Sequence, residues 1–176
     1  SLQAIHAFRG ERPFYLPKIF IRVRTPQQIN GLISRLGDAQ ALLTGFTLPK
    51  FSLENADAYI EAIEAANACS AAPVYMMPIL ESPTMVSLQD RYRILYGLKE
   101  RLDPVSGHVL NIRVGGNDLC HVFGFRRHSD ESIYKIRPIS NILSDIVTVF
   151  GMDYVISGPV WEYYSGEGWD TGLKKE

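Results

Sequence analysis

The sequence Val74-Tyr75-Met76-Met77-Pro78-Ile79-Leu80-Glu81 decides the fold, because it is an apolar run that stops at a carboxylate. Apolar residues at successive positions are typical of a β-strand that is buried on both faces of a parallel sheet. Runs of the same kind occupy Lys18–Val23, Ala41–Leu48, Val109–Val114 and Tyr154–Ser157. We therefore predict a strand over Val74–Leu80 and over each of these four ranges.

Helical patterns separate the predicted strands. Thr25 followed by Pro26 predicts the start of a helix, and Gly37 predicts its end. Further helices are predicted from Ser52, from about Pro83 to Leu102 and from about Pro138 to Phe150. In the helix before Leu102, we expect Leu88 and Tyr92 to face inward.

Strands that alternate with helices predict a parallel sheet of the α/β class. Two architectures remain open: a doubly wound, flavodoxin-like sheet, or consecutive units of a (β/α)8 TIM barrel, which typically needs about 250 residues. A flavodoxin-like nucleotide-binding domain is disfavoured, because Arg24-Thr25-Pro26 follows the first strand where a Gly-rich phosphate loop would stand.

Composition narrows the class of protein. With 176 residues, 46% of them hydrophobic, the chain can bury the core of one domain. Its net charge of −1 gives no electrostatic footprint for nucleic acid or an anionic membrane, and no apolar run is long enough to span a bilayer. We expect no export signal, and we expect Cys69 and Cys120 to be free, buried thiols in a reducing compartment. A cytoplasmic protein is the resulting prediction.

Charged residues follow the predicted strands where each one ends. Arg22 ends the first run, Lys50 follows the second, Glu81 follows the third, and Asp118 follows the fourth after Gly115-Gly116-Asn117. Ligands bind at this edge of parallel α/β folds, and two carboxylates suit a hard divalent cation such as Mg²⁺. The acids can instead pair with Arg22, Arg24, Lys50 or Arg113, and Asp118 can cap a helix.

The pair Gly115-Gly116 also has two compatible interpretations. It predicts a tight turn that requires positive φ, and it predicts a backbone that a ligand carboxylate can approach closely.

Four motifs in order resemble the citrate lyase β-subunit/HpcH–HpaI aldolase superfamily. They are Ile21-Arg22-Val23-Arg24, Leu48-Pro49-Lys50, Pro78-Ile79-Leu80-Glu81-Ser82-Pro83 and Arg113-Val114-Gly115-Gly116-Asn117-Asp118-Leu119. The longer stretches Leu110–Arg127 and Asp153–Tyr164 are most similar to its branch called the C-C bond lyases of the TIM-barrel fold.

The resemblance implies a magnesium-dependent lyase or aldolase that cleaves or forms a 3-hydroxy acyl compound through a metal-stabilised enolate. Its substrate would be a small carboxylate or a coenzyme A thioester, and its partners would include neither nucleic acid nor membrane. Glu81 and Asp118 would bind Mg²⁺ or Mn²⁺, with Arg22 and Lys50 as catalytic residues. Arg22, Gly115, Gly116, Asn117 and Pro159 would bind substrate. A homo-oligomer is also expected.

The matched motifs resemble those on the third to seventh strands of the family's barrel. The family's early acidic segment and its last strand have no counterpart here. We therefore expect a single partial TIM-barrel domain over residues 1–176, with about five βα units. The other strands would be absent because the chain is truncated, or because other portions of a longer chain are unresolved. A rival prediction is a noncatalytic relative that keeps the metal and ligand sites but lacks the groups for turnover.

Overall fold

The computed structural model describes residues 1–11, 14–126, 128 and 131–158. Its strands are β1 (Ile19–Arg22), β2 (Leu43–Leu48), β3 (Tyr75–Leu80), β4 (Ile112–Val114) and β5 (Ile156–Ser157). Its α-helices are α1 (Leu2–Glu11), α2 (Gln27–Leu36), α3 (Ala56–Cys69), α4 (Arg91–Leu102), α5 (Gly116–Val122) and α6 (Arg137–Phe150). Short 3₁₀ helices are η1 (Gly37–Leu42), η2 (Pro83–Val86), η3 (Asp103–His108) and η4 (Ile133–Lys135).

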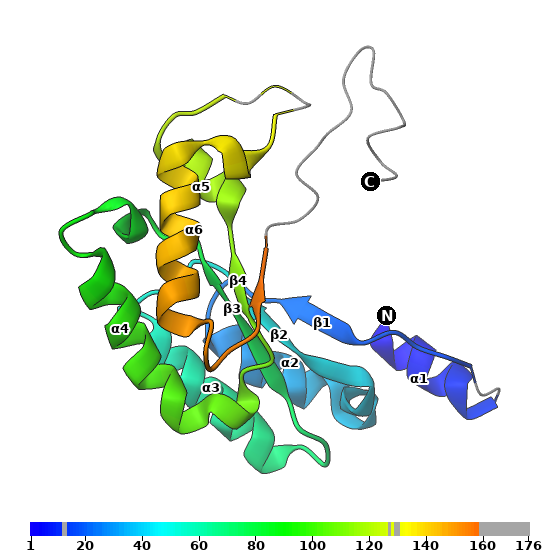
Figure 1. Cartoon of the computed structure of the whole chain (residues 1–176). Coiled ribbons are helices and arrows are strands. Elements are labelled where there is room, and N and C mark those ends of the chain that lie inside the picture. Colours follow the sequence, from blue (N-terminus) through cyan, green and yellow to red (C-terminus); the bar gives the residue numbers. More distant parts are fainter. Residues whose placement is uncertain (12–13, 127, 129–130, 159–176) are drawn as a thin grey trace.

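All five predicted strands form one parallel sheet in the order β1-β2-β3-β4-β5. A flavodoxin-like sheet would change direction and carry helices on both faces. Here each strand pairs with the next one in the chain, and α2, α3, α4 and α6 cover one face (Figure 1). Over the described residues, this singly wound arrangement is α/β and corresponds to an incomplete barrel of the TIM type, and it excludes the flavodoxin-like alternative.

The two faces of the sheet have different chemistry. The face under the helices carries Phe46, Leu48, Met76, Leu80 and Ile112, all buried in one apolar core with the helices. Alternate residues of a strand point to the opposite face. That second face carries Arg22 and Thr47, which pair in register, and Ile79 and Arg113, which also pair. Charged side chains therefore stand on the face that lines the inside of a barrel.

The predicted helix over Pro83–Leu102 is wrong in its first half. The chain forms η2, turns through Ser87–Asp90 and only then begins α4. The turn is closed by Ser87, whose hydroxyl donates to Asp90 Oδ2 (3.1 Å) and accepts from the Asp90 amide (3.3 Å). Leu88 and Tyr92, expected to face inward, are 79% and 46% exposed because the turn resets the helical phase.

Several boundaries also differ from the sequence prediction. The strand predicted from Ala41 begins at Leu43, because η1 follows directly on α2 after Gly37, whose φ of +52° ends that helix. Helices α1 and α5 had not been predicted. Cys120 is buried as expected, but Cys69 is exposed at the end of α3, so the prediction of two buried thiols is wrong for Cys69. Neither forms a disulfide.

Among the described residues, no helix combines the length and apolar character that crossing a membrane requires.

Candidate active site

Glu81 lies at the centre of the candidate site. It follows β3 directly and is only 4% exposed. Its Oε1 accepts a hydrogen bond from the backbone amide of Lys50 (3.1 Å) and lies 3.7 Å from Nη2 of Arg22. The ion pair between Arg22 and Glu81 that the sequence allowed is therefore present, although the Arg22 side chain is 63% exposed. Burying a carboxylate is costly unless it is paired or hydrogen-bonded, so these contacts are needed to hold Glu81 here.

Asp118 approaches Glu81 from the neighbouring unit. It lies in the first turn of α5, not at the cap, which is Gly115. Burial raises the pKa of Glu81 above its ordinary 4.5, and the nearby Asp118 carboxyl raises it further by repulsion and by a hydrogen bond between the two groups. The Lys50 amide and Arg22 act in the opposite direction. Two acids are thus held together at the carboxyl edge of the sheet, where their like charges repel.

Gly115 allows the two acids to lie close together because it has no side chain, and not because of its backbone angles. Its φ is −92°, so the expectation of a turn that requires positive φ is wrong at this position. A Cβ on Gly115 would lie 3.0 Å from Cδ of Glu81, and closer still to Oε2 and Cβ of the same residue. The Gly115 amide donates to Leu80 O (3.2 Å), which fixes the two segments side by side. Only glycine leaves room for the Glu81 carboxyl here.

Lys50 stands in a left-handed conformation, with φ of +51°. A non-glycine residue in this region is disfavoured by about 1–2 kcal/mol, and such residues cluster at functional sites. The conformation turns the Lys50 amide toward Glu81, while its side chain is exposed. The described contact of Lys50 with the site is therefore made by its backbone.

A cavity of about 300 Å³ brings the candidate residues together. Six of the sequence-predicted residues line it: Arg22, Glu81, Gly115, Gly116, Asn117 and Asp118. The side chain of Lys50 is not part of the lining, and Pro159 lies outside the described residues. The interpretation of the strand-end residues as one cluster thus agrees with the geometry.

Five residues of the lining were not among the predicted site residues, namely Phe20, Thr47, Ile79, Arg113 and Val114. The sequence allowed Arg113 as an ion-pair partner of the two acids, but Arg113 is half-buried and makes no ion pair with any residue the structure describes. Strand alternation could have found Arg113, because its neighbours Ile112 and Val114 are apolar and lie in the core, which turns Arg113 to the opposite face.

A larger cavity, of about 610 Å³, lies away from the candidate residues. Its lining includes Gly37–Ala41 in part, just before β2, and Cys69–Ala72, just before β3. It therefore opens near the amino ends of the strands. Because parallel α/β folds bind ligands at the carboxyl ends of their strands, the smaller cavity is the candidate active site.

The described acids, cysteines and histidines contain no metal-binding group of three or more, so Glu81 and Asp118 stand as a pair. Comparison with known proteins adds the decisive observation. The whole chain, residues 1–176, matches the model of a family described as C-C bond lyase of the TIM-barrel fold. The chain belongs to this family. No curated protein and no solved structure matches it.

Membership in the C-C bond lyase family agrees with the singly wound parallel sheet and supports a carbon–carbon lyase activity. It also gives the cavity at the carboxyl edge a chemical context. Breaking a carbon–carbon bond leaves an electron pair on one fragment, and an active site must stabilise that charge. The lining of this cavity offers two arginines for anions and two acids for a cation.

Proposed function

We propose that this chain is a magnesium-dependent lyase of the citrate lyase β-subunit/HpcH–HpaI type, which cleaves or forms a 3-hydroxy acyl compound. The observation that carries the proposal is the convergence of Glu81 and Asp118, with Arg22, in one cavity at the carboxyl edge of the sheet. Family membership supports the reaction class, and the site supports the finer assignment.

The two acids fit a divalent cation. Carboxylate oxygens are the ligands that Mg²⁺ and Mn²⁺ prefer, and Mg²⁺ often uses only one or two protein carboxylates. Burial and mutual repulsion disfavour the charged form of Glu81, and a cation between the acids would remove both penalties. Glu81 and Asp118 would hold the ion, which supplies positive charge beside the oxygen on which negative charge develops as the bond breaks.

Arg22 is suited to bind the reacting end of the substrate. Its guanidinium presents a planar fork that matches a carboxylate or enolate oxygen, and it already lies 3.7 Å from Glu81. Because the side chain is largely exposed at the cavity, it can exchange its weak contact with Glu81 for a substrate anion. Its charge is permanent, so it stabilises the anion throughout the reaction.

The remaining lining positions the substrate. Gly115 and Gly116 place bare backbone beside the acids, which allows a ligand carboxylate to approach closely. Asn117 and Arg113 add polar groups to the same cavity, and Lys50 orients Glu81 through its amide. Pro159 is carried over from the family motif alone. The ligand is a small carboxylate or its coenzyme A thioester, and we expect the chain to work in the cytoplasm as a homo-oligomer.

The test is turnover of a panel of 3-hydroxy acids and their coenzyme A thioesters by the chain, with Mg²⁺ and with a chelator. The proposal expects release of a pyruvate-, acetyl- or glyoxylate-type product that depends on Mg²⁺. A chain that binds these acids and releases no product, with Mg²⁺ present, is instead a noncatalytic relative that keeps the ligand site.

A further inference from the structure

Arg91 is the most deeply buried charged side chain outside the cavity among the residues that the structure describes. It is the first residue of α4, and the residue is 3% exposed. A guanidinium in such a place requires partners, because burying an unpaired charge is strongly destabilising. The partners of the Arg91 guanidinium therefore identify the segments that this side chain links.

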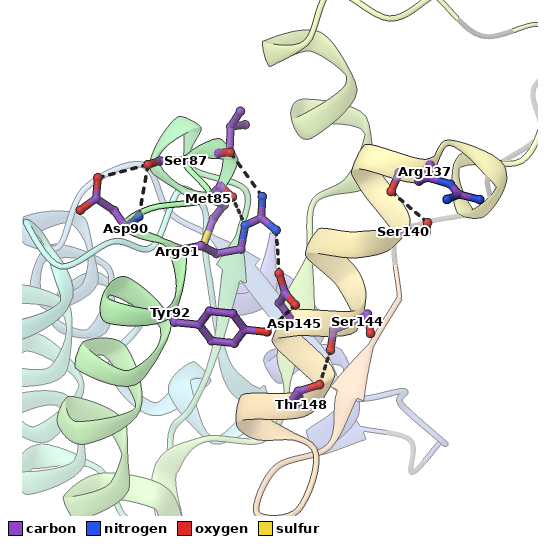
Figure 2. Close-up of polar contacts among 11 residues, drawn as sticks. Met85, Ser87, Asp90, Arg91, Tyr92, Arg137, Ser140, Ser144, Asp145 and Thr148 are labelled. Carbon is purple, nitrogen blue, oxygen red and sulfur yellow. Dashed lines mark hydrogen bonds and ion pairs between the residues drawn. The ribbon is translucent and has the colours of Figure 1, made fainter.

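Arg91 binds two segments that are far apart in the sequence. Its Nε donates to Met85 O (2.6 Å) and its Nη2 to Val86 O (3.3 Å), while Nη1 forms an ion pair with Oδ2 of Asp145 in α6 (2.6 Å). Figure 2 shows the guanidinium between these groups. Asp145 also accepts from the Tyr92 hydroxyl (2.8 Å), so the acid is fixed from two sides.

The two carbonyls close the end of η2, the short helix that follows Glu81. Terminal carbonyls of a helix lack partners within the helix, and Arg91 supplies them. Ser82 holds the other end: its hydroxyl accepts from Thr84 and its carbonyl from the amide of Met85 (3.0 Å). The segment after Glu81 is therefore fastened at both ends.

This segment also touches the element that carries the second acid. Helix η2 packs against α5, and Asp118 lies in the first turn of α5. A shift of η2 would move Glu81, to which it is joined through Ser82, and it would move Asp118 through the contact between η2 and α5. The position of both carboxyls thus depends on where η2 lies, and Arg91 ties η2 to α6.

We propose that Arg91 is a positioning residue, which holds η2 against α6 through Asp145 so that Glu81 and Asp118 meet in the geometry that binds the cation. This inference rests on the proposed function for its purpose. Groups that orient metal ligands typically change metal affinity by about 10- to 100-fold when they are altered. A guanidinium is needed, because only its fork reaches two carbonyls and an acid together.

The experiment compares Arg91→Lys with Arg93→Lys in the whole chain. Lysine at position 91 keeps the charge but loses the fork. Arg93, on the same helix, is an exposed partner of Asp90 (3.0 Å) and serves as the control. The first readout needs no metal: the amide proton of Lys50, which donates to Glu81, reports the place of that carboxyl in NMR spectra. Spectra are recorded below the melting transition of each variant.

We expect the Lys50 amide proton to move upfield in Arg91→Lys and not in Arg93→Lys, and Mg²⁺ to bind roughly 10- to 100-fold more weakly to Arg91→Lys. If Arg91→Lys does not fold, Asp145→Asn takes its place, with the same shift expected. An unchanged Lys50 amide in a folded variant overturns the inference and leaves Arg91 a purely structural residue. Failure of the parent chain to bind Mg²⁺ counts against the proposed function, while the Lys50 signal still decides the role of Arg91.

Discussion

Replacing Gly115 by alanine is the sharpest test of the site's packing. The added Cβ would stand 3.0 Å from Cδ of Glu81 and nearer to Oε2, whereas ordinary contact begins at 3.4 Å. Glu81 is buried and held by the Lys50 amide, so it cannot swing into solvent without losing that bond. Relief requires a displacement of roughly 1 Å, and overpacking of this kind is typically destabilising by about 1–3 kcal/mol.

The assay is thermal denaturation of the parent chain and Gly115→Ala, each with a chelator and with saturating Mg²⁺. We expect a lower free energy of unfolding in chelator and loss of the stabilisation that bound Mg²⁺ adds to the parent. Gly107→Ala is the control, because its Cβ would meet no atom within 4 Å. A Gly115→Ala chain that melts like the parent and still gains stability from Mg²⁺ would refute the packing of Glu81 over Gly115.

Three further predictions follow from named residues. In chelator, the protonated Glu81 carboxyl stabilises the fold fully below pH 4.5, and this stabilisation is lost as the pH rises through the raised pKa of Glu81. Glu81→Gln should therefore gain free energy of unfolding relative to the parent over that pH range. Parallel profiles of stability against pH for the two proteins would contradict this prediction. Arg22→Met should lower kcat by roughly 10²- to 10³-fold with a smaller change in KM, as expected for a group that stabilises developing charge; early melting with normal turnover would make Arg22 structural. Gly31→Ala, exposed within α2 with no atom near its Cβ, should raise the free energy of unfolding by about 0.5–1 kcal/mol in denaturant titrations, and no gain would mean that helix propensity is not limiting there.

The fold could be predicted from the sequence because apolar runs mark the strands, and proline and glycine mark the helix ends, along most of the chain. Apolar runs such as Val74–Leu80 are buried strands, and Pro26 and Gly37 frame a helix that the structure contains. The order of the strands in the sheet could not be predicted in this way, because hydrophobic periodicity does not show which strands pair. The helix boundary at Ser87–Asp90 was missed because side-chain hydrogen bonds of Ser87 and Asp90, not a glycine or proline, break the helix.

The candidate site was predictable only in part. Residues directly after a strand, such as Glu81, share an edge of any parallel sheet, so their meeting follows from the fold class. Arg113 was considered only as a partner of the acids, although its place between Ile112 and Val114 turns it to the opposite face of the sheet. The left-handed conformation of Lys50 and the space above Gly115 depend on contacts between units, which no local pattern encodes.

Mg²⁺ binding by Glu81 and Asp118 can be measured by calorimetric titration of the parent chain, Glu81→Gln and Asp118→Asn. Each substitution removes one carboxylate and keeps the size of the side chain. We expect the parent chain to bind Mg²⁺ and each variant to lose much of that affinity, because both acids would hold the same ion. Equal binding by all three proteins would contradict the proposed metal site.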